Sequence, residues 1–221
     1  MQLLHARDVL NKKPELRREL KGFIEWISET PAENTVKGMY VAGLLQTLET
    51  VGVVPPKRER LQAFKDYSLR EYMDLLLDSA LTIYPNSTVH NGLRSLGRLV
   101  IPTFATSIIG KVIMATASRS WDLSLKCVSR GYAASLKPGK CTVAEMTSGS
   151  ALLQLRDIWN FGDSYQVGVI DGMMEWCRIQ GKITPTVISR SSVDLAIEWQ
   201  PERAPRRQRS QPPGPFIATR P

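Results

Sequence analysis

The side chains that most often carry catalysis or bind metals are scarce in this chain of 221 residues. It contains two histidines, His5 and His90, and three cysteines, Cys127, Cys141 and Cys177. No pair of them has a zinc-ligand spacing such as Cys-x-x-Cys. A serine or cysteine nucleophile needs a neighbouring base, and two isolated histidines offer little for building a triad. We therefore expect no metal, no cofactor and no enzymatic activity.

Acid–base chemistry has one candidate pair, Asp171 and Glu175, which stand one helical turn apart. Two carboxylates can act as acid and base, but this spacing is also typical of a solvated helix face. The glycine patterns that accompany nucleophilic serines or phosphate-binding loops are absent from the sequence. The pattern favours a binding protein over an enzyme.

A site for an apolar ligand needs a different set of side chains. Methionine and aromatic residues adapt to irregular gaps, and several of them could line a pocket between the two halves of the chain. The same residue types are typical of a plain hydrophobic core, and the sequence leaves both readings open. The candidate ligand-binding residues are Phe104, Ile108, Met114, Met173, Trp176 and Cys177.

Positive charge is concentrated at the end of the chain, where residues 201–221 contain five arginines and one glutamate. This composition predicts a disordered tail rich in proline and arginine. The tail could be a solubilising extension or could contact an acidic partner electrostatically. Aromatic residues that would stack on bases are lacking there apart from Phe216, so nucleic acid is not the favoured partner. The candidate partner-binding residues are Arg203, Arg206, Arg207 and Arg209.

The segment 162–199 predicts the elements that would position these side chains, a long helix followed by two strands. Gly168 and Gly172 lie one turn apart in the predicted helix, which is expected to end at Gly181. Because glycine costs a helix interior about 1 kcal/mol relative to alanine, the pair suggests that another backbone packs there. The predicted apolar stripe is Tyr165, Val169, Met173, Trp176 and Cys177.

Alternating apolar residues predict the strands. Thr186 and Ile188 and then every second residue of 193–199 are expected to face inward, with a turn at Ser191 and Ser192. Segments 132–136 and 141–146 flank a Pro-Gly turn and predict a hairpin, and 152–156 predicts a further strand.

Earlier in the chain the apolar periodicity is helical, with helices expected from Pro14, from about Gly38, from Ser68, over 89–100 and from Ser120. Glu71 stands three residues after Ser68, in capping-box spacing. The predicted fold is α+β: a helical N-terminal half packed on a small, mainly antiparallel sheet with one long C-terminal helix. Residues 1–35 are expected to form a helical extension, 36–200 a single domain and 201–221 the tail.

Residues 36–199 resemble an uncharacterised domain family that is expanded into many paralogues in myxobacteria. The order and spacing of the shared motifs carry the resemblance. They are Lys37-Gly38-Met39-Tyr40, Gly43-Leu44, 67–72, Tyr84-Pro85, 93–97, Gly110, Gly131-Tyr132, the Gly162, Gly168 and Gly172 series, and Ile197-Glu198-Trp199. The resemblance implies no activity.

The element order is also distantly similar to small-molecule-sensing domains of the vinyl-reductase-associated, trafficking-complex and haem–nitric-oxide types. Those domains set a helical half against a sheet and can enclose an apolar ligand. Haem binding would need an axial histidine, and the Tyr-x-Ser-x-Arg signature that grips haem propionates is missing. Haem is therefore disfavoured.

The sparse cysteines and polar N-terminus predict reduced thiols in a cytoplasmic protein. Segment 99–117 is apolar, but Pro102 and Lys111 interrupt it, so a buried helix is expected there and no transmembrane segment. We predict a non-enzymatic regulatory or sensory domain that binds a protein partner and an apolar small molecule. The alternative is an interaction or scaffold protein that uses its arginine tail, and the sequence leaves open a homodimer.

Overall fold

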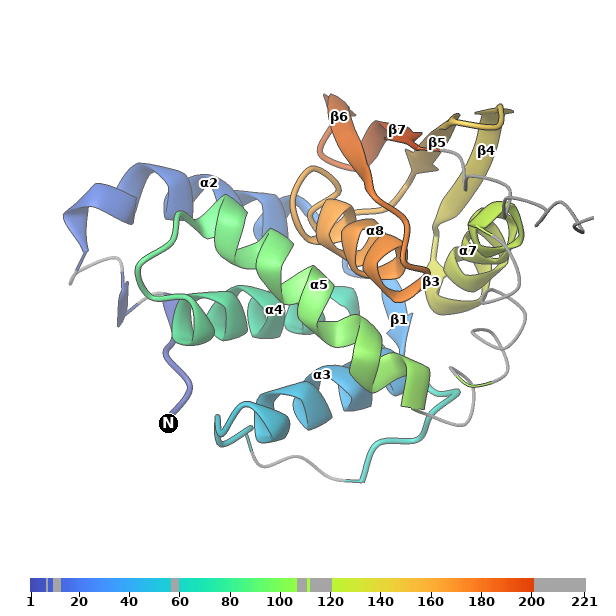
Figure 1. Cartoon of the computed structure of the whole chain (residues 1–221). Coiled ribbons are helices and arrows are strands. Elements are labelled where there is room, and N and C mark those ends of the chain that lie inside the picture. Colours follow the sequence, from blue (N-terminus) through green and yellow to red (C-terminus); the bar gives the residue numbers. More distant parts are fainter. Residues whose placement is uncertain (7, 10–12, 57–59, 107–110, 112–120, 201–221) are drawn as a thin grey trace, which may run out of the picture.

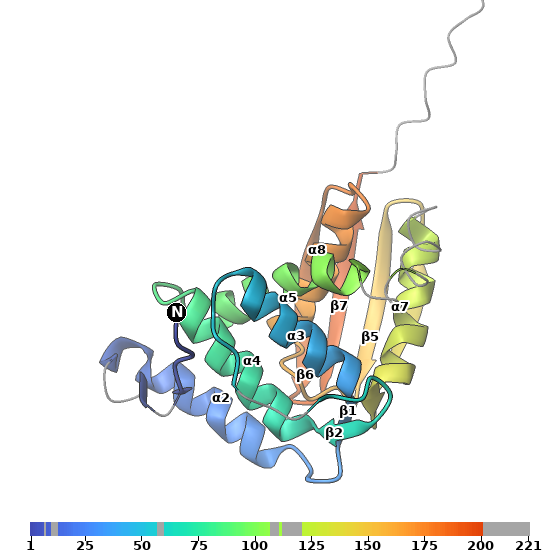
Figure 2. The same cartoon turned by 90° about the horizontal axis from the view of Figure 1, so that it is seen from below.

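The computed structural model describes residues 1–6, 8–9, 13–56, 60–106, 111 and 121–200. Within these residues the protein has an α+β fold of six α-helices and two antiparallel sheets (Figure 1). The helices of the first half lie on one side of the molecule, and a four-stranded sheet with two further helices lies on the other (Figures 1 and 2).

The first half is helical because its apolar residues recur at helical spacing. A short 3-10 turn η1 (Pro14–Leu16) leads into α2 (Arg17–Glu29), followed by α3 (Gly38–Thr50), α4 (Leu69–Ile83) and α5 (Val89–Thr106). The predicted cap of α4 is confirmed, since the Ser68 hydroxyl accepts a hydrogen bond from the Glu71 N–H at 3.4 Å. Short strands β1 (Thr35–Lys37) and β2 (Asp66–Ser68) pair with each other at the starts of α3 and α4.

The second half contains α7 (Trp121–Ser135), β3 (Leu136–Lys137), β4 (Lys140–Met146), β5 (Ser150–Arg156), α8 (Tyr165–Trp176), β6 (Gly181–Ser189) and β7 (Ser192–Trp199). The larger sheet has the order β4-β5-β7-β6, and all of its neighbouring strands are antiparallel. β3 joins β1 and β2 in the smaller sheet. Helices α7 and α8 lie against the same face of the larger sheet (Figure 1).

The alternation predicted for the last strand is confirmed. Every second residue of β7, from Val193 to Trp199, is buried and faces α7 and α8, and β5 alternates in the same way. Trp199 meets Trp121 of α7 edge to face, with ring centroids 6.0 Å apart. The buried side chains of this face form the part of the core that lies between the sheet and the two helices.

Helix α2 lies outside the segment 36–200 that was expected to form the domain, yet it packs closely on the second half. Phe161, in the loop before α8, is fully buried and has a φ of 57°. Its ring lies 5.3 Å from that of Phe23 and 5.6 Å from that of Trp26, between centroids, in edge-to-face geometry. Arg190, at the tip of the β6–β7 hairpin, pairs with Glu29 of α2 at 2.7 Å. These contacts join α2 to the second half of the chain.

Helix α8 is shorter than predicted, spanning 12 residues, and Gly181 begins β6 instead of ending the helix. The chain leaves the helix at Arg178, which has a φ of 59°. The N–H of Arg178 bonds to the carbonyl of Glu175 and that of Ile179 to the carbonyl of Met174, the pattern of a Schellman motif. An arginine occupies the left-handed position that glycine usually takes, so sequence periodicity gave no sign of the helix end.

Two strand predictions are wrong. Residues 132–135 belong to the last turn of α7, and β4 pairs with β5 instead of with this segment. In β6 the predicted inward residues are wrong, because Ile183 and not Thr186 lies on the face of the buried β7 residues: Ile183 pairs with Ile197, and Thr186 pairs with Asp194. Ile188 lies at the register shift between Val187 and Ser189 and is 58% exposed. Pro102 lies inside α5, which continues to Thr106.

Within the described residues, no helix is long and apolar enough to cross a membrane. The predicted buried helix of 99–117 falls partly outside these residues.

Candidate functional site

A cavity of ≈ 120 Å³ lies where the helices of the two halves meet. Its walls come from α3, from the second half of α5, and from α7 and α8. Further lining residues belong to β1, β3, α4 and the loop before α8. The lining residues are Val36, Met39, Tyr40, Gly43, Leu44, Tyr72, Val100, Ile101, Phe104, Cys127, Val128, Gly131, Tyr132, Ser135, Leu136, Asn160, Tyr165, Gln166, Val169 and Met173. The lining is mostly apolar, and none of the described residues in it is acidic or basic.

Helices α5 and α8 approach each other closely near their middle, and the cavity lies beside this crossing. At the crossing, a Cβ on Gly168 would overlap the carbonyl oxygen of Arg94, and one on Gly97 would overlap that of Tyr165. The predicted backbone contact at Gly168 and Gly172 is thereby confirmed. Away from the crossing, Tyr40 of α3 and Phe104 of α5 stack with centroids 5.8 Å apart and form one wall.

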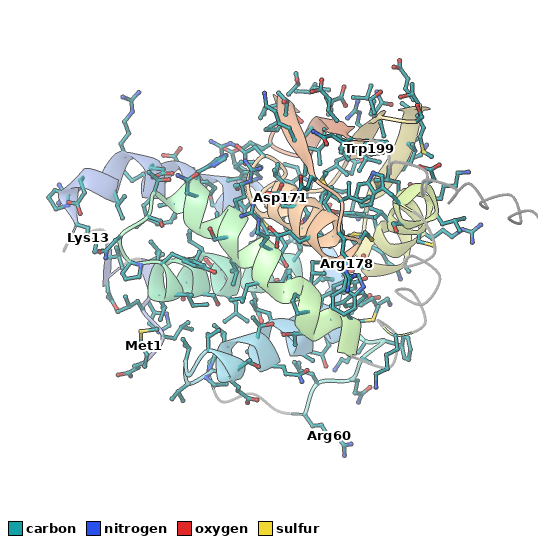
Figure 3. The ribbon with its side chains drawn as sticks, viewed as in Figure 1. Met1, Lys13, Arg60, Asp171, Arg178 and Trp199 are labelled. Carbon is teal, nitrogen blue, oxygen red and sulfur yellow. The ribbon has the colours of Figure 1, made fainter. Side chains whose placement is uncertain are left out.

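Asp171 of α8 lies at the same crossing and bonds to α5 (Figure 3). Its carboxylate accepts two hydrogen bonds from Arg94, at 2.7 and 3.2 Å, and one from Arg98 at 3.1 Å. Glu175 pairs with Arg98 at 3.2 Å. Asp171 and Glu175 therefore form ion pairs with the arginines of α5. This role is structural.

One end of the cavity is polar. The hydroxyls of Tyr72 and Tyr165 lie 3.1 Å apart, and the hydroxyl of Tyr132 donates to Oε1 of Gln166. Gln166 in turn donates from Nε2 to the backbone carbonyl of Asn160 at 3.3 Å. The side-chain Oδ1 of Asn160 is buried and has no hydrogen-bond partner among the described residues.

Four tyrosines line the cavity and form what we call the tyrosine group: Tyr40, Tyr72, Tyr132 and Tyr165. Burial raises the pKa of each of them. The pKa values of Tyr72 and Tyr132 lie well above the ordinary value, that of Tyr165 rises to about 12, and that of Tyr40 is also raised, in each case chiefly because burial penalises the charged form. The four hydroxyls are neutral at physiological pH. The cavity is thus an environment that disfavours charge.

The structure brings together two of the predicted ligand-binding residues, Phe104 and Met173, in the cavity lining. Trp176, the last residue of α8, is not a lining residue and is 43% exposed. Cys177 also lies away from the lining and contacts the hydroxyl of Ser124 at 3.4 Å. The ligand role of all four residues stays a prediction.

Ile108, Met114 and the four tail arginines, Arg203, Arg206, Arg207 and Arg209, lie outside the described residues. Sequence reasoning missed the tyrosine group, which comes from α3, α4, α7 and α8. Motifs that carried the family resemblance include Tyr40, Tyr72 and Tyr132, and that was the available signal.

The two histidines lie away from the cavity. His5 pairs with Asp78, with Nδ1 2.8 Å from Oδ2, and His90 lies near the start of α5 with Nε2 3.9 Å from a carboxylate oxygen of Asp163. In the described part of the chain, no group of three histidine, cysteine, aspartate or glutamate side chains is placed to hold a metal ion. Cys141 is buried, which raises its pKa to about 11 and keeps its thiol protonated.

Residues 30–200 match the family model described as "Protein of unknown function (DUF2378)". The chain belongs to this family, so the resemblance to an uncharacterised domain family is confirmed. A search of the curated proteins gave no match.

Solved structures of H-NOX domains share the fold, which confirms the distant likeness to the haem–nitric-oxide type. An oxygen-binding H-NOX domain related to soluble guanylate cyclases, in its oxygen complex, aligns with a TM-score of 0.57 and 15% identity over 74% of this chain and 95% of that one. A structure concerned with haem redox potential and porphyrin distortion gives the same values. An Fe(II) unliganded mutant H-NOX protein from K. algicida gives 0.52 and 16%, over 75% and 97%. At this identity the likeness shows the fold alone.

Proposed function

We propose that the protein is a non-enzymatic sensory domain that binds a small apolar molecule in the cavity between α3, α5, α7 and α8. The observation that carries the proposal is the cavity itself, an apolar space of ≈ 120 Å³ at the junction of the two halves. A pocket of apolar walls with a few convergent polar groups is the usual form of a small-molecule site. The fold shared with H-NOX domains supports a sensory role.

A ligand in this position would contact both halves at once. Tyr40 and Phe104 belong to the first half, and Tyr132 and Met173 to the second. A ligand shifts a conformational equilibrium only by its difference in affinity between two states. Contacts with both halves allow such a difference, which makes the site suitable for sensing.

Haem does not fit the cavity residues, although the H-NOX structures include one concerned with haem redox potential. Neither histidine is a lining residue, and the volume is close to the roughly 150 Å³ of an engineered apolar cavity that binds benzene. A porphyrin is several times larger than one benzene ring. The ligand we propose is therefore a single small molecule of about ring size.

The proposal includes no chemical step. Cys127 and Ser135 are the nucleophile types in the lining, and no histidine accompanies them there. The Ser135 hydroxyl donates to the backbone carbonyls of Gly131, at 2.6 Å, and Tyr132, at 3.1 Å, so it is held by backbone and not by a base.

Filling the cavity tests the proposal. Gly131 of α7 lines the cavity, and nothing lies within 4 Å of where its Cβ would be; Gly22 of α2 has equally open surroundings outside the cavity. We expect Gly131→Leu to abolish binding of toluene, a single-ring probe, in calorimetric titration and any ligand mass seen by native mass spectrometry, and Gly22→Leu to leave both unchanged. Wild-type protein that carries only its polypeptide mass and binds no single-ring apolar probe would remove the proposal.

The arginine tail supports a second function, an electrostatic contact with an acidic protein. The observation that favours it is the content of residues 201–221, five arginines against one glutamate. Deleting 201–221 is expected to weaken a salt-sensitive interaction in a pulldown while leaving the melting temperature unchanged. Equal capture by intact and shortened protein at low salt would count against it.

A further inference from the structure

Among the described residues, the large apolar side chain with the greatest exposure is that of Phe64, at 71%. Phe64 lies in the loop between α3 and β2. A single exposed apolar residue is common on protein surfaces and needs no explanation by itself. Two further observations distinguish Phe64: its loop is held by hydrogen bonds, and cations surround it.

The backbone around Phe64 is bonded to the body of the protein. The first two N–H groups of α3 donate to the carbonyls of Lys65 and Ala63, both at 2.9 Å. The Lys37 ammonium donates to the carbonyl of Phe64 at 2.9 Å. Three successive carbonyls are therefore fixed, and the exposure of the ring is a property of the fold.

Gly38 permits this close contact between the loop and α3. A Cβ on Gly38 would overlap the carbonyl oxygen of Gln62 and the ring of Tyr67. The Tyr67 hydroxyl in turn accepts a hydrogen bond from the N–H of Gln62 at 3.0 Å. Part of the motif Lys37-Gly38-Met39-Tyr40 thus serves to hold the loop in place.

Positive charge predominates around the loop. Residues 60–68 together with β1 and β3 contain four basic residues and one acidic residue, a net charge of +3. They are Arg60, Lys65, Lys37, Lys137 and the acidic Asp66. The side chain of Lys37 is only 17% exposed and pairs with Asp66 at 2.7 Å, so it offsets the one negative charge.

Three exposed cations remain. Lys65 follows Phe64 directly, and Lys137 of β3 reaches Asp66 at 3.3 Å, which places it beside the loop. Arg60 is exposed and points away from the molecule (Figure 3). We call the stretch 60–66 together with Lys137 the basic loop surface.

An apolar ring among cations is complementary to an anionic lipid surface. The ring can enter the boundary between headgroups and acyl chains while the long basic side chains stay at the headgroup level. Two of the three cations are lysines, a residue type that is depleted from protein–protein interfaces. One ring is also a small apolar contact for a stable protein interface. The chemistry therefore favours a membrane over an acidic protein.

We propose that the basic loop surface is a membrane-contact site: Phe64 inserts at the headgroup level of an anionic bilayer, and Arg60, Lys65 and Lys137 bind the headgroups. One ring and three charges make the contact peripheral and reversible. This inference does not depend on the cavity or on its ligand.

Co-sedimentation of the full chain with lipid vesicles tests the proposal. We expect binding to phosphatidylcholine vesicles with about 30% phosphatidylserine to be roughly a hundredfold tighter than to phosphatidylcholine alone, since each cation contributes about fivefold near an anionic surface. The binding should weaken as salt rises. Equal binding to the two kinds of vesicle, or binding to neither, would overturn the proposal.

Substitutions in the full chain separate this surface from the arginines of residues 201–221, which can also attract anionic lipids. Phe64→Ser is expected to weaken binding about tenfold through the lost apolar contact, and Lys65→Glu about twentyfold because it changes the charge by two. If both variants bind like the wild type, another surface makes the contact and the proposal is overturned.

The matched controls are Ile188→Ser, near the tip of the β6–β7 hairpin, and Lys21→Glu in α2, both at exposed positions. The hairpin tip and α2 lie away from the loop (Figure 1), so vesicle binding should be unchanged. All four substituted side chains are exposed, and the melting temperatures should match that of the wild type. Controls that weaken binding as much as Phe64→Ser and Lys65→Glu would overturn the assignment to this surface.

The variant Phe64→Trp reports insertion directly. Tryptophan emission shifts to the blue when the indole leaves water, and this side chain is well suited to the membrane interface. Anionic vesicles should therefore shift the emission of Phe64→Trp and leave that of Ile188→Trp as in the wild type. Sedimentation of Phe64→Trp with the vesicles without such a shift would show that the ring does not insert and would overturn the proposal.

Discussion

Helices α5 and α8 take part in two adjacent regions that are packed in opposite ways. At their crossing, Gly97, Gly168 and Gly172 bring the two backbones into contact. A few residues further along, Phe104 and Met173 of the same helices line a cavity. One pair of helices is therefore joined without a gap at one place and bounds an open space at the next.

Glycines occur in both regions, but the space around them differs. A methyl group on Gly168 would overlap the backbone of α5, whereas nothing lies within 4 Å of the corresponding position at Gly43 and Gly131. The first type of glycine permits a close approach of two backbones, and the second leaves open space beside the cavity. The difference shows that the glycine content of a helix does not by itself say what the glycine is for.

The largest expected effect comes from adding a side chain where α5 and α8 cross. Gly168→Ala would place Cβ against the carbonyl of Arg94, and both atoms belong to packed backbone that cannot move independently. We expect a loss of about 3 kcal/mol or more in the free energy of unfolding, at the upper end of overpacking effects. Urea unfolding measures it. A loss below about 1 kcal/mol would mean that the helices separate easily and would break the comparison.

The second prediction concerns the ion pairs that hold the same crossing. Asp171 is largely buried and bonds to both Arg94 and Arg98, whereas Glu175 is 63% exposed and pairs with Arg98 alone. Asp171→Asn is expected to cost about 2 kcal/mol, and the control Glu175→Gln close to nothing. Unfolding at low and high salt checks both. Equal effects would show that the crossing depends on its glycines and not on this carboxylate.

The third prediction moves to the cavity. Tyr72→Phe removes the bond to the Tyr165 hydroxyl and should cost about 1 kcal/mol at neutral pH. The pKa values of Tyr72, Tyr132 and Tyr165 are raised by burial. The folded state therefore keeps protons that the unfolded chain releases above pH ~10, and stability present below that pH is lost as the pH rises further.

Chemical unfolding between pH 8 and pH 11 follows this loss. In the double variant Tyr72→Phe/Tyr165→Phe two of the buried hydroxyls no longer titrate, so stability should fall with a shallower slope above pH ~10, by about 1.4 kcal/mol per pH unit for each fully ionising tyrosine removed. A slope identical to that of the wild type would mean that water reaches these hydroxyls in the folded protein.

The sequence predicted the crossing better than the cavity, for a physical reason. The spacing of Gly168 and Gly172 is a local signal, because a glycine pair in a helix interior needs a packing explanation. The tyrosine group is assembled from four separate elements, and each tyrosine alone resembles ordinary core. Local patterns also identified α4 from Ser68 and Glu71.

The end of α8 shows what periodicity misses. The apolar stripe of this segment runs on through Trp176 and Cys177, and a Schellman motif with Arg178 in a left-handed conformation ends the helix directly after them. Trp176 is the last residue of the helix and is 43% exposed, so the stripe predicted its place in the helix but not its exposure. Backbone capping by an arginine has no composition signal, since glycine is the expected residue there.

The smallest expected effect has the opposite sign and gives the most direct comparison of the two kinds of glycine. Gly131→Ala adds a methyl group inside α7 where nothing lies within 4 Å, and Gly22→Ala does the same in α2 away from the cavity. Both should stabilise the protein by about 0.5–1 kcal/mol, because alanine restricts the unfolded chain and favours the helix. Thermal unfolding measures the two gains side by side. If Gly131→Ala is destabilising while Gly22→Ala stabilises, the space beside α7 is filled in solution, and the contrast between a closed crossing and an open cavity no longer holds.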